Sequence, residues 1–159
     1  MVILTLITVG TLKEGYLTDA VNEYKKRLLQ YARVEEINIK EEAIKSEDDA
    51  SEITRALKAE GEKILAKIPK DSATVALCVE GKQFDSVALA ERIREMQNEK
   101  GKITLIIGSS HGLSNEVKER ADLKLSVSKL TFPHQLMRPL LFEVVYRSFT
   151  IIAGKKYHK

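Results

Sequence analysis

The sequence predicts an α/β fold in which a parallel sheet carries helices on both faces. Apolar runs of strand length alternate with segments of helical periodicity along the whole chain, as they do in βα units. Several of these runs are continuously apolar, which is typical of strands that are covered on both faces. No repeat, linker or low-complexity tract interrupts the alternation, and 159 residues suit one domain better than two. We therefore expect residues 1–159 to form a single domain.

The first part of the chain predicts a strand, a helix and a second strand. Residues 2–9 form an apolar run that predicts a buried strand. The next segment predicts an amphipathic helix because apolar side chains recur at spacing four, with Leu17 and Val21 beside them: Leu12, Tyr16, Ala20, Tyr24 and Leu28. Residues 34–39 alternate as a half-exposed strand does. Residues 35–52 hold eight acids and two lysines, so we expect a solvated loop that runs into a helix.

The middle of the chain predicts a second helix and a third strand. Apolar side chains between residues 53 and 68 define the helix, and Pro69 stops it. Residues 74–79 predict a buried strand, and Gly81-Lys82 predicts a turn after it.

The elements that follow have recognisable ends. Asp85 can cap a third helix, and Gly101 ends it. The inward side chains of this helix are expected to be Leu89, Ile93 and Met96. Residues 103–107 form the most apolar strand. A short helix over residues 114–120 follows, with Ser114 or Asn115 as its cap.

The chain closes with a strand over residues 123–127 and an apolar helix from about Leu136 to Ile152. Proline breaks a hydrogen bond inside a helix but is tolerated in its first turn. Pro139 therefore predicts that the regular helix begins near Leu136 or later. The tail after Ile152 holds three lysines and one tyrosine, and we expect it to pack little against the core.

Composition narrows the class of protein. Hydrophobic residues make up 43% and charged residues 31%, which is typical of a folded soluble domain rather than a disordered chain. The single cysteine, Cys78, cannot form an internal disulfide and is interpreted as a small buried hydrophobe. No apolar run approaches the roughly 18 residues that span a membrane, and the N-terminal run lacks the features of a signal peptide. We expect a cytoplasmic protein that contacts no membrane.

Positive charge is concentrated at the C-terminal end. Residues 124–159 hold seven Lys and Arg side chains against one acid, Glu143, so this quarter carries +6 while the whole chain carries +3. Such an asymmetry favours a polyanionic partner near the last helix. The alternative is an ordinary solvated tail.

The motifs argue against a dinucleotide site, a phosphate loop and a metal site, and they leave a site that binds its ligand mainly through backbone groups. The loop from Gly108 to Gly112 is not a dinucleotide fingerprint, and Tyr16 stands where a phosphate loop starting at Gly10 would need lysine. The three histidines lie far apart without a nearby cysteine, so no metal site is expected. What remains is a ligand held by backbone groups of the loops after the strands. Five residues could supply apolar walls: Leu77, Ile107, Val127, Leu130 and Phe132. Alternatively, these are core residues beside ordinary turns.

Four motifs together resemble one family. They are Gly108-x-Ser110-x-Gly112-Leu113, the run LSVSKLTFPHQLMR at residues 125–138, Glu143-x-x-Tyr146-Arg147, and the terminal Tyr157-His158-Lys159. The chain is similar along its whole length to the SPOUT-type methyltransferases that modify N3 of a pseudouridine in large-subunit ribosomal RNA. Pro139 departs from the family pattern, since an aliphatic residue would suit a helix better there.

The resemblance implies a parallel α/β fold with a C-terminal trefoil knot, a homodimer that completes each site, and S-adenosyl-L-methionine as cofactor. Carried over by position, the cofactor contacts fall on Leu77, Gly108, Val127, Ser128, Lys129, Leu130, Thr131 and Phe132. The implied reaction is methylation of N3 of pseudouridine 1915 in the helix 69 loop of 23S rRNA, in the assembled ribosome. Two alternatives remain: a non-catalytic ribosome-binding or RNA-binding factor of the same fold, and a methyltransferase that acts on a different RNA.

The acceptor N3 is an imide nitrogen that must lose its proton, and a cation near its oxygens would stabilise the resulting charge. No single general base stands out, so the catalytic candidates are His134, Arg138, Tyr157 and His158. The RNA-binding candidates combine cations for phosphates with an aromatic ring for a splayed base. They are Arg138, Lys155, Lys156, Tyr157, His158 and Lys159.

Overall fold

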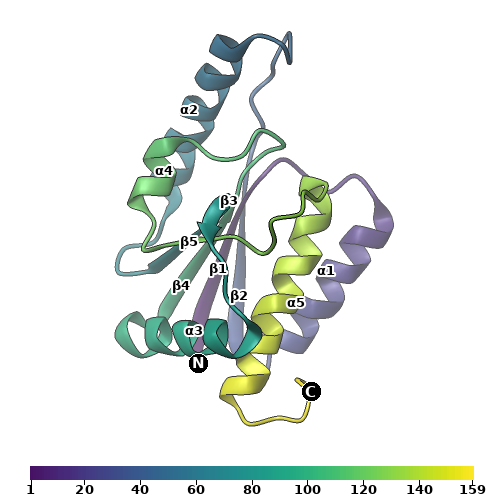
Figure 1. Cartoon of the computed structure of the whole chain (residues 1–159), viewed down its shortest axis with the longest axis vertical. Coiled ribbons are helices and arrows are strands. Elements are labelled where there is room, and N and C mark those ends of the chain that lie inside the picture. The colour runs from purple at the N-terminus through teal and green to yellow at the C-terminus, as the bar shows by residue number, and fades with distance from the viewer.

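The computed structural model describes residues 1–159 and contains one five-stranded sheet (Figure 1). Every paired strand runs parallel to its neighbours, and the strand order is β2-β1-β4-β3-β5. The strands are β1 (Val2–Val9), β2 (Ala32–Ile39), β3 (Ala73–Lys82), β4 (Lys102–Ile107) and β5 (Leu123–Leu125). The predicted α/β class and parallel sheet are confirmed.

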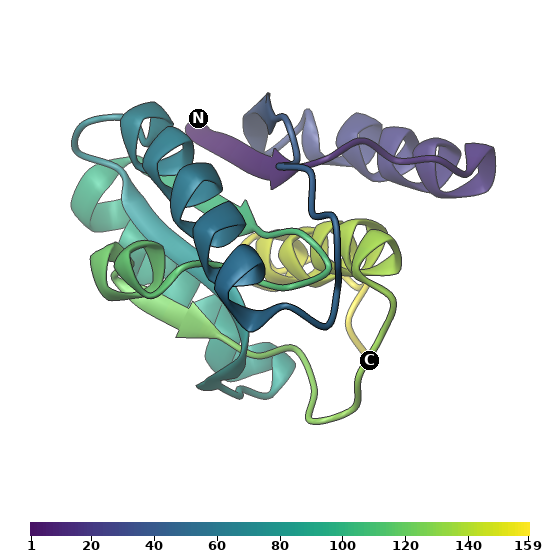
Figure 2. The same ribbon diagram turned by 90° about the horizontal axis from the view of Figure 1, so that it is seen from above.

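Five helices cover the two faces of this sheet (Figures 1 and 2). They are α1 (Gly15–Leu28), α2 (Ala50–Lys67), α3 (Ser86–Lys100), α4 (Asn115–Arg120) and α5 (His134–Ile152). Helices α1, α3 and α5 pack on one face, and α2 and α4 pack on the other. None of the helices is long and apolar enough to cross a membrane.

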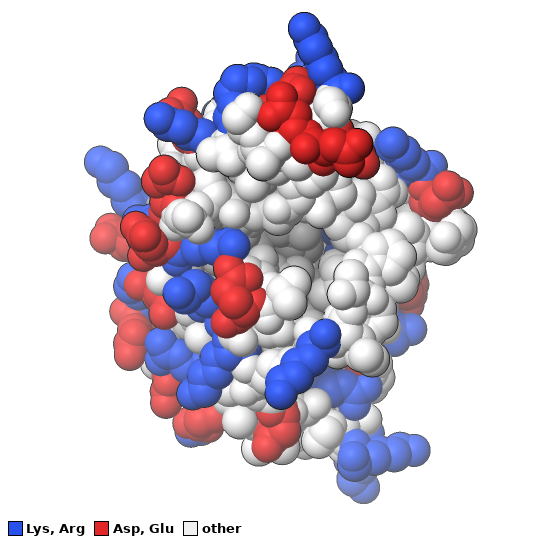
Figure 3. All heavy atoms as spheres, turned by 45° about the horizontal axis from the view of Figure 1, so that its top comes forward, with Lys and Arg blue, Asp and Glu red and all other residues white.

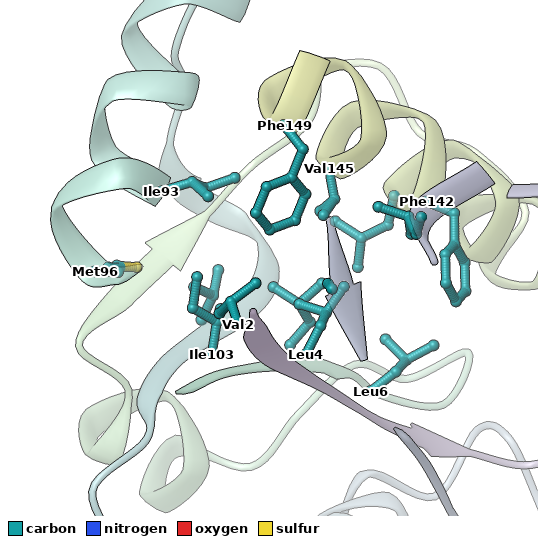
Figure 4. Close-up of a cluster of buried hydrophobic side chains, with 14 of the residues drawn as sticks. Val2, Leu4, Leu6, Ile93, Met96, Ile103, Phe142, Val145 and Phe149 are labelled. Atoms are coloured by element: carbon teal, nitrogen blue, oxygen red, sulfur yellow. The ribbon is translucent and has the colours of Figure 1, made fainter. Parts of the chain in front are cut away.

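Successive side chains of the central strands point to opposite faces of the sheet, so the hydrophobic core consists of two clusters. In β1, Leu4 and Leu6 point into a large cluster beneath α1, α3 and α5, while Ile7 and Val9 point into a smaller cluster beneath α2 and α4. Figure 4 shows the larger cluster, where Phe142, Val145 and Phe149 of α5 lie over the strands. Because both faces of β1 and β4 are buried, these strands need the continuous apolar runs that the sequence contains.

The predicted helix ends are confirmed where a local signal marks them. The Asp85 side chain accepts a hydrogen bond from the Ala88 amide and caps α3. Gly101 ends α3 with φ at 65°, in the left-handed region that glycine tolerates best. Of the two candidate caps for α4, the structure uses Ser114, whose Oγ accepts from the Val117 amide.

Two predictions of local structure are wrong. Gly81 and Lys82 do not form a turn: β3 continues through them, and Lys82 pairs with Leu125 of β5 after an irregularity in the register. Val79, predicted to be buried, is 73% exposed. The apolar side predicted for α1 is confirmed at Leu17, Val21 and Leu28, which are buried, and Tyr24 packs against the core, whereas Tyr16 is exposed.

The start of α5 also differs from the prediction. The helix begins at His134, so that Pro139 lies inside it instead of in its first turn. Pro133 precedes the helix, and its carbonyl accepts from the amides of Leu136 and Met137. Pro139 removes one hydrogen bond within α5, but the residue is buried. Packing against the sheet therefore holds the helix together across this position.

Candidate functional site

A pocket opens at the carboxyl edge of the sheet, between the second half of β3 and the loops that follow β4 and β5. Its volume is about 310 Å³. Apolar side chains supply much of the lining, together with serine and threonine hydroxyls. Figure 3 shows this side of the molecule hollowed, with uncharged atoms inside and charged side chains of both signs around the rim. The size and lining suit a small organic ligand.

The pocket brings together seven of the eight residues predicted as cofactor contacts. Those that line it are Leu77, Gly108, Val127, Ser128, Leu130, Thr131 and Phe132. Lys129 is exposed and is not among the lining residues. All five of the predicted apolar walls lie on the pocket, since Ile107 lines it as well. These residues come from β3, from the end of β4 with the loop after it, and from the loop after β5, so their convergence follows from the parallel arrangement of the three strands.

The loop after β4 is a tight turn that closes on itself. The Gly112 amide donates to the Ser109 carbonyl at 2.9 Å, and Gly112 has φ at 88°. A Cβ added at Gly108 would lie 2.1 Å from the Gly112 carbonyl oxygen, so no side chain fits there without movement of the backbone. The turn therefore requires glycine at both of its ends.

The loop after β5 is held by its own serines and by β3. Ser126 Oγ donates to the Ser128 carbonyl at 3.1 Å, and the Leu130 amide donates to Ser128 Oγ at 3.0 Å. The Ser126 amide donates to the Lys82 carbonyl at 3.0 Å. At Gly81 an added Cβ would lie 2.6 Å from the backbone of Leu125. The extended end of β3 therefore packs closely against the start of this loop and fixes its position.

Several other residues on the pocket were not predicted from the sequence. Cys78 and Val79 line it from β3, and so does Glu80, where β3 extends past its predicted end. Lys118 reaches it from α4 and forms an ion pair with Glu80 at 2.5 Å. Cys78 is half-buried, not fully buried as expected, and burial raises the pKa of its thiol. The apolar run that ends near Val79 predicts a buried strand, so the exposure of this segment could not be predicted from the sequence.

Two predicted catalytic candidates lie at the start of α5, in different environments. His134 is half-buried on the pocket, and burial lowers its pKa below the ordinary histidine value. The nearby carboxylate of Glu41 opposes this shift, and the charges of Arg138 and Lys13 add to it. Arg138 is 7% exposed and donates to the carbonyls of Val9 at 3.1 Å and Gly10 at 2.5 Å. In this chain Arg138 therefore ties α5 to the end of β1, while His134 faces the pocket.

The C-terminal tail does not extend into solvent as expected. Its tyrosine packs on α5: the Tyr157 hydroxyl donates to Glu143 Oε2 at 2.8 Å, and the ring meets Tyr146 edge-on at 4.9 Å between centroids. The Arg147 guanidinium lies 4.7 Å from the Tyr157 ring centroid, and Arg147 also contacts His158. The expectation of a loosely packed tail is therefore wrong, because the i, i+4 pair of Glu143 and Arg147 provides an anchor for it.

The contacts that anchor Tyr157 also shift the pKa values of the ionisable groups around it. Burial alone would raise the pKa of Glu143, but hydrogen bonds from Tyr157, Tyr24 and Arg147 lower it below its ordinary value. Burial and the Glu143 carboxylate raise the pKa of Tyr24 to about 12. Lys155, Lys156 and Lys159 remain exposed beside this cluster. The three lysine side chains of the tail are therefore exposed next to Tyr157, whose contacts with α5 hold the tail in place.

The tail and the pocket lie at opposite ends of α5. Helix α5 has 19 residues, and its first residue, His134, lines the pocket. At 1.5 Å per residue its length is about 28 Å. Figure 1 shows the C-terminus near the far end of this helix. The predicted catalytic candidates Tyr157 and His158 are therefore not brought together with His134 within one chain.

An open parallel sheet with a ligand-sized pocket beyond its carboxyl edge defines a ligand-binding α/β protein. The chain matches the family described as "Predicted SPOUT methyltransferase" over residues 2–158. It therefore belongs to the SPOUT methyltransferase family, as the resemblance predicted.

Curated relatives match over nearly the full length of this chain. The "Ribosomal RNA large subunit methyltransferase H" of Shouchella clausii is 47% identical over 157 residues, which are 98% of this chain and 99% of the relative. The protein of the same name from Caldicellulosiruptor bescii is 49% identical over 154 residues, covering 97% of this chain and 98% of the relative. Sequences this similar over such lengths share one fold and one arrangement of elements.

Solved structures with lower identity support the fold alone. A probable methyltransferase from Bordetella pertussis Tohama I has a TM-score of 0.58 at 14% identity, covering 92% of this chain and 93% of that one. A probable methylase family protein from Haemophilus influenzae Rd KW20 has a TM-score of 0.57 at 18% identity, covering 98% of this chain and 70% of that one.

Proposed function

We propose that this chain transfers a methyl group from S-adenosyl-L-methionine to N3 of pseudouridine 1915 in the helix 69 loop of 23S rRNA, in the assembled ribosome in the cytoplasm. The observation that carries the proposal is the convergence, on one pocket, of seven residues that the family resemblance assigns to the cofactor. Membership of the SPOUT methyltransferase family and the names of the full-length relatives support the reaction and the class of RNA.

The residues that line the pocket fit S-adenosylmethionine. Leu77, Ile107 and Leu130 offer apolar walls for a flat purine, and backbone groups of the loops after β4 and β5 can pair with its edge. The hydroxyls of Ser128 and Thr131 can pair with a ribose. When bound, the cofactor supplies an activated methyl group on a sulfonium. The task of the chain is to align the acceptor with that methyl and exclude water, because such a transfer is an in-line displacement. We further propose that the segment around this pocket forms the trefoil knot expected for the family.

The reaction also requires removal of the proton from N3 of the acceptor. An imide nitrogen attacks only after its proton has left, so a neutral base or a nearby cation must act at N3. His134 is the candidate of this kind that lines the pocket, and its lowered pKa keeps the imidazole neutral at neutral pH. Lys155, Lys156 and Lys159 are exposed and can hold RNA phosphates.

A homodimer would let the tail of one chain serve the pocket of the other, since the two are separated by the length of α5. Helix α5 also keeps an apolar stripe that its own chain leaves half-buried, at Leu136, Leu140, Val144 and Ile151. Burial of this stripe against a second copy would remove apolar surface from water. We predict a dimer in sedimentation at micromolar concentration. The variant Leu140→Glu should shift the protein toward monomer, and a wild-type monomer would contradict the prediction.

Methyl transfer itself can be measured with ribosomes. With tritium-labelled S-adenosylmethionine, 50S subunits and 70S ribosomes prepared without this modification should be compared as acceptors. We expect label in 23S rRNA of 70S ribosomes at N3 of pseudouridine 1915, and none when this uridine is left unconverted. Ribosome binding without transfer would identify a non-catalytic factor, and label at another nucleotide would identify a different RNA substrate.

A further inference from the structure

One ion pair supplies the charged side chains of the pocket lining. Glu80, near the end of β3, and Lys118, on α4, both line the pocket, and no other Asp, Glu, Lys or Arg does. Lys118 Nζ lies 2.5 Å from Glu80 Oε1. The hydrogen bond from Lys118 lowers the pKa of the Glu80 carboxyl below its ordinary value, so Glu80 is ionised at neutral pH. The pocket therefore presents one negative and one positive group side by side.

The fold holds the backbone of both residues in place. Val117, which precedes Lys118 on α4, is 0% exposed and belongs to the smaller core cluster. On the other side, β3 pairs with β5 both before and after Glu80, at Leu77 and at Lys82. The two charged residues lie 38 positions apart in the chain, so only the packing of α4 beside β3 brings them together. Their position on the pocket is therefore a property of the folded core.

The pair keeps hydrogen-bonding capacity that its own contact does not use. One hydrogen bond joins the two side chains, and it occupies one carboxylate oxygen and one of the three donors of the ammonium group. One oxygen and two N–H donors are left for other partners. The side chain of Lys118 is 20% exposed and that of Glu80 is 55% exposed, and ion pairs open to solvent contribute little to the free energy of unfolding. Stability of the fold is therefore a weak reason for placing both charges on the pocket.

The ligand group that complements this pair is a zwitterion. A group with an ammonium beside a carboxylate can place its carboxylate on Lys118 and its ammonium on Glu80, so that four charges alternate in sign. An anion alone, such as an RNA phosphate, would meet the carboxylate of Glu80 next to the ammonium group of Lys118. S-adenosylmethionine ends in an amino-acid group of the complementary kind, and the apolar walls of the pocket suit its purine.

We propose that Glu80 and Lys118 together bind the amino-acid end of S-adenosylmethionine, with Lys118 Nζ donating to its carboxylate and the Glu80 carboxylate accepting from its ammonium group. This inference rests on the proposed function, which supplies the ligand. The pair determines specificity: it selects a nucleoside that carries a complete amino-acid group over one that lacks it. The purine is bound elsewhere in the pocket, so its contacts do not depend on the pair.

The test is calorimetry with two ligands that differ at this end. S-adenosylhomocysteine carries the amino-acid group, and 5′-methylthioadenosine has the same purine, ribose and thioether sulfur without it. The wild type should bind S-adenosylhomocysteine at least about tenfold more tightly. Lys118→Met and Glu80→Gln should each weaken binding of S-adenosylhomocysteine by about tenfold, the loss expected for one hydrogen bond to a charged group. Binding of 5′-methylthioadenosine should stay the same in both variants.

Two exposed residues of α4 provide matched controls. Arg120→Met removes one positive charge, as Lys118→Met does, and Glu119→Gln removes one negative charge, as Glu80→Gln does. Both control residues are exposed and lie outside the pocket lining. Each control variant should bind both ligands as the wild type does, because a change in net charge alone is screened by salt at this distance from the ligand.

The outcomes separate this inference from the function on which it rests. Wild-type protein that binds neither ligand would overturn both. Equal affinity of the wild type for the two ligands would overturn the role of the pair, and this comparison needs no variant to fold. The role would also be overturned if both variants bind S-adenosylhomocysteine as the wild type does, or if they lose both ligands alike. Discrimination between the ligands that depends on the pair, without methyl transfer to ribosomes, would overturn the function and support this inference.

Discussion

Gly108→Ala is expected to abolish detectable binding of S-adenosylhomocysteine, with a loss of at least about a hundredfold, or roughly 2.8 kcal/mol. The new Cβ would lie 2.1 Å from the carbonyl oxygen of Gly112 and 2.5 Å from its carbonyl carbon. Both contacts are with backbone, so the turn itself must move, and its amides and carbonyls line the proposed cofactor pocket. Alanine is the smallest side chain that creates this conflict, and a larger one such as arginine would also fill the pocket.

A matched substitution controls for the general effect of replacing glycine by alanine. Gly15, at the start of α1, has no atom within 4 Å of an added Cβ and no positive φ. Gly15→Ala should therefore bind S-adenosylhomocysteine as the wild type does. Calorimetry measures the binding, and circular dichroism checks that both variants keep the fold. Wild-type affinity in Gly108→Ala would place the cofactor elsewhere.

Deletion of residues 157–159 is expected to reduce methylation of ribosomes by at least roughly tenfold, equivalent to about 1.4 kcal/mol of transition-state stabilisation. S-adenosylhomocysteine binding should stay unchanged, because the tail lies at the far end of α5 from the pocket. The melting temperature should fall by about 2–4 °C, since loss of the Tyr157 hydrogen bond and ring contact costs on the order of 1 kcal/mol.

Point variants separate anchoring of the tail from its binding to RNA. Tyr157→Phe keeps the ring against Tyr146 but removes the donor to Glu143, so it should share the stability loss of the truncation. Lys156→Ala should leave stability unchanged. If Lys156 binds one phosphate, its removal should reduce the salt dependence of ribosome binding by about one unit of slope. A truncated protein with full methylation activity would show that the tail takes no part in the reaction.

The candidate site was predictable from sequence to the extent that it follows from strand order along the chain. A parallel sheet places the carboxyl ends of its strands at one edge, so the second half of β3 and the loops after β4 and β5 meet there. Seven of the eight residues that the family resemblance assigns to the cofactor line the pocket at this edge. Lys129 differs because exposure of one loop side chain depends on the exact path of the loop, which Ser126 and Ser128 fix by hydrogen bonds.

The sequence by itself determined the elements whose signals are local. The caps at Asp85 and Ser114 and the stop at Gly101 depend on residues within one turn of helix, and the buried strands depend on a run of adjacent side chains. Only the tertiary structure decided how far β3 continues and where Tyr157 docks. The same holds for Arg138 at the end of β1. Each of these depends on a contact between residues far apart in the chain, whose free energy no local pattern contains.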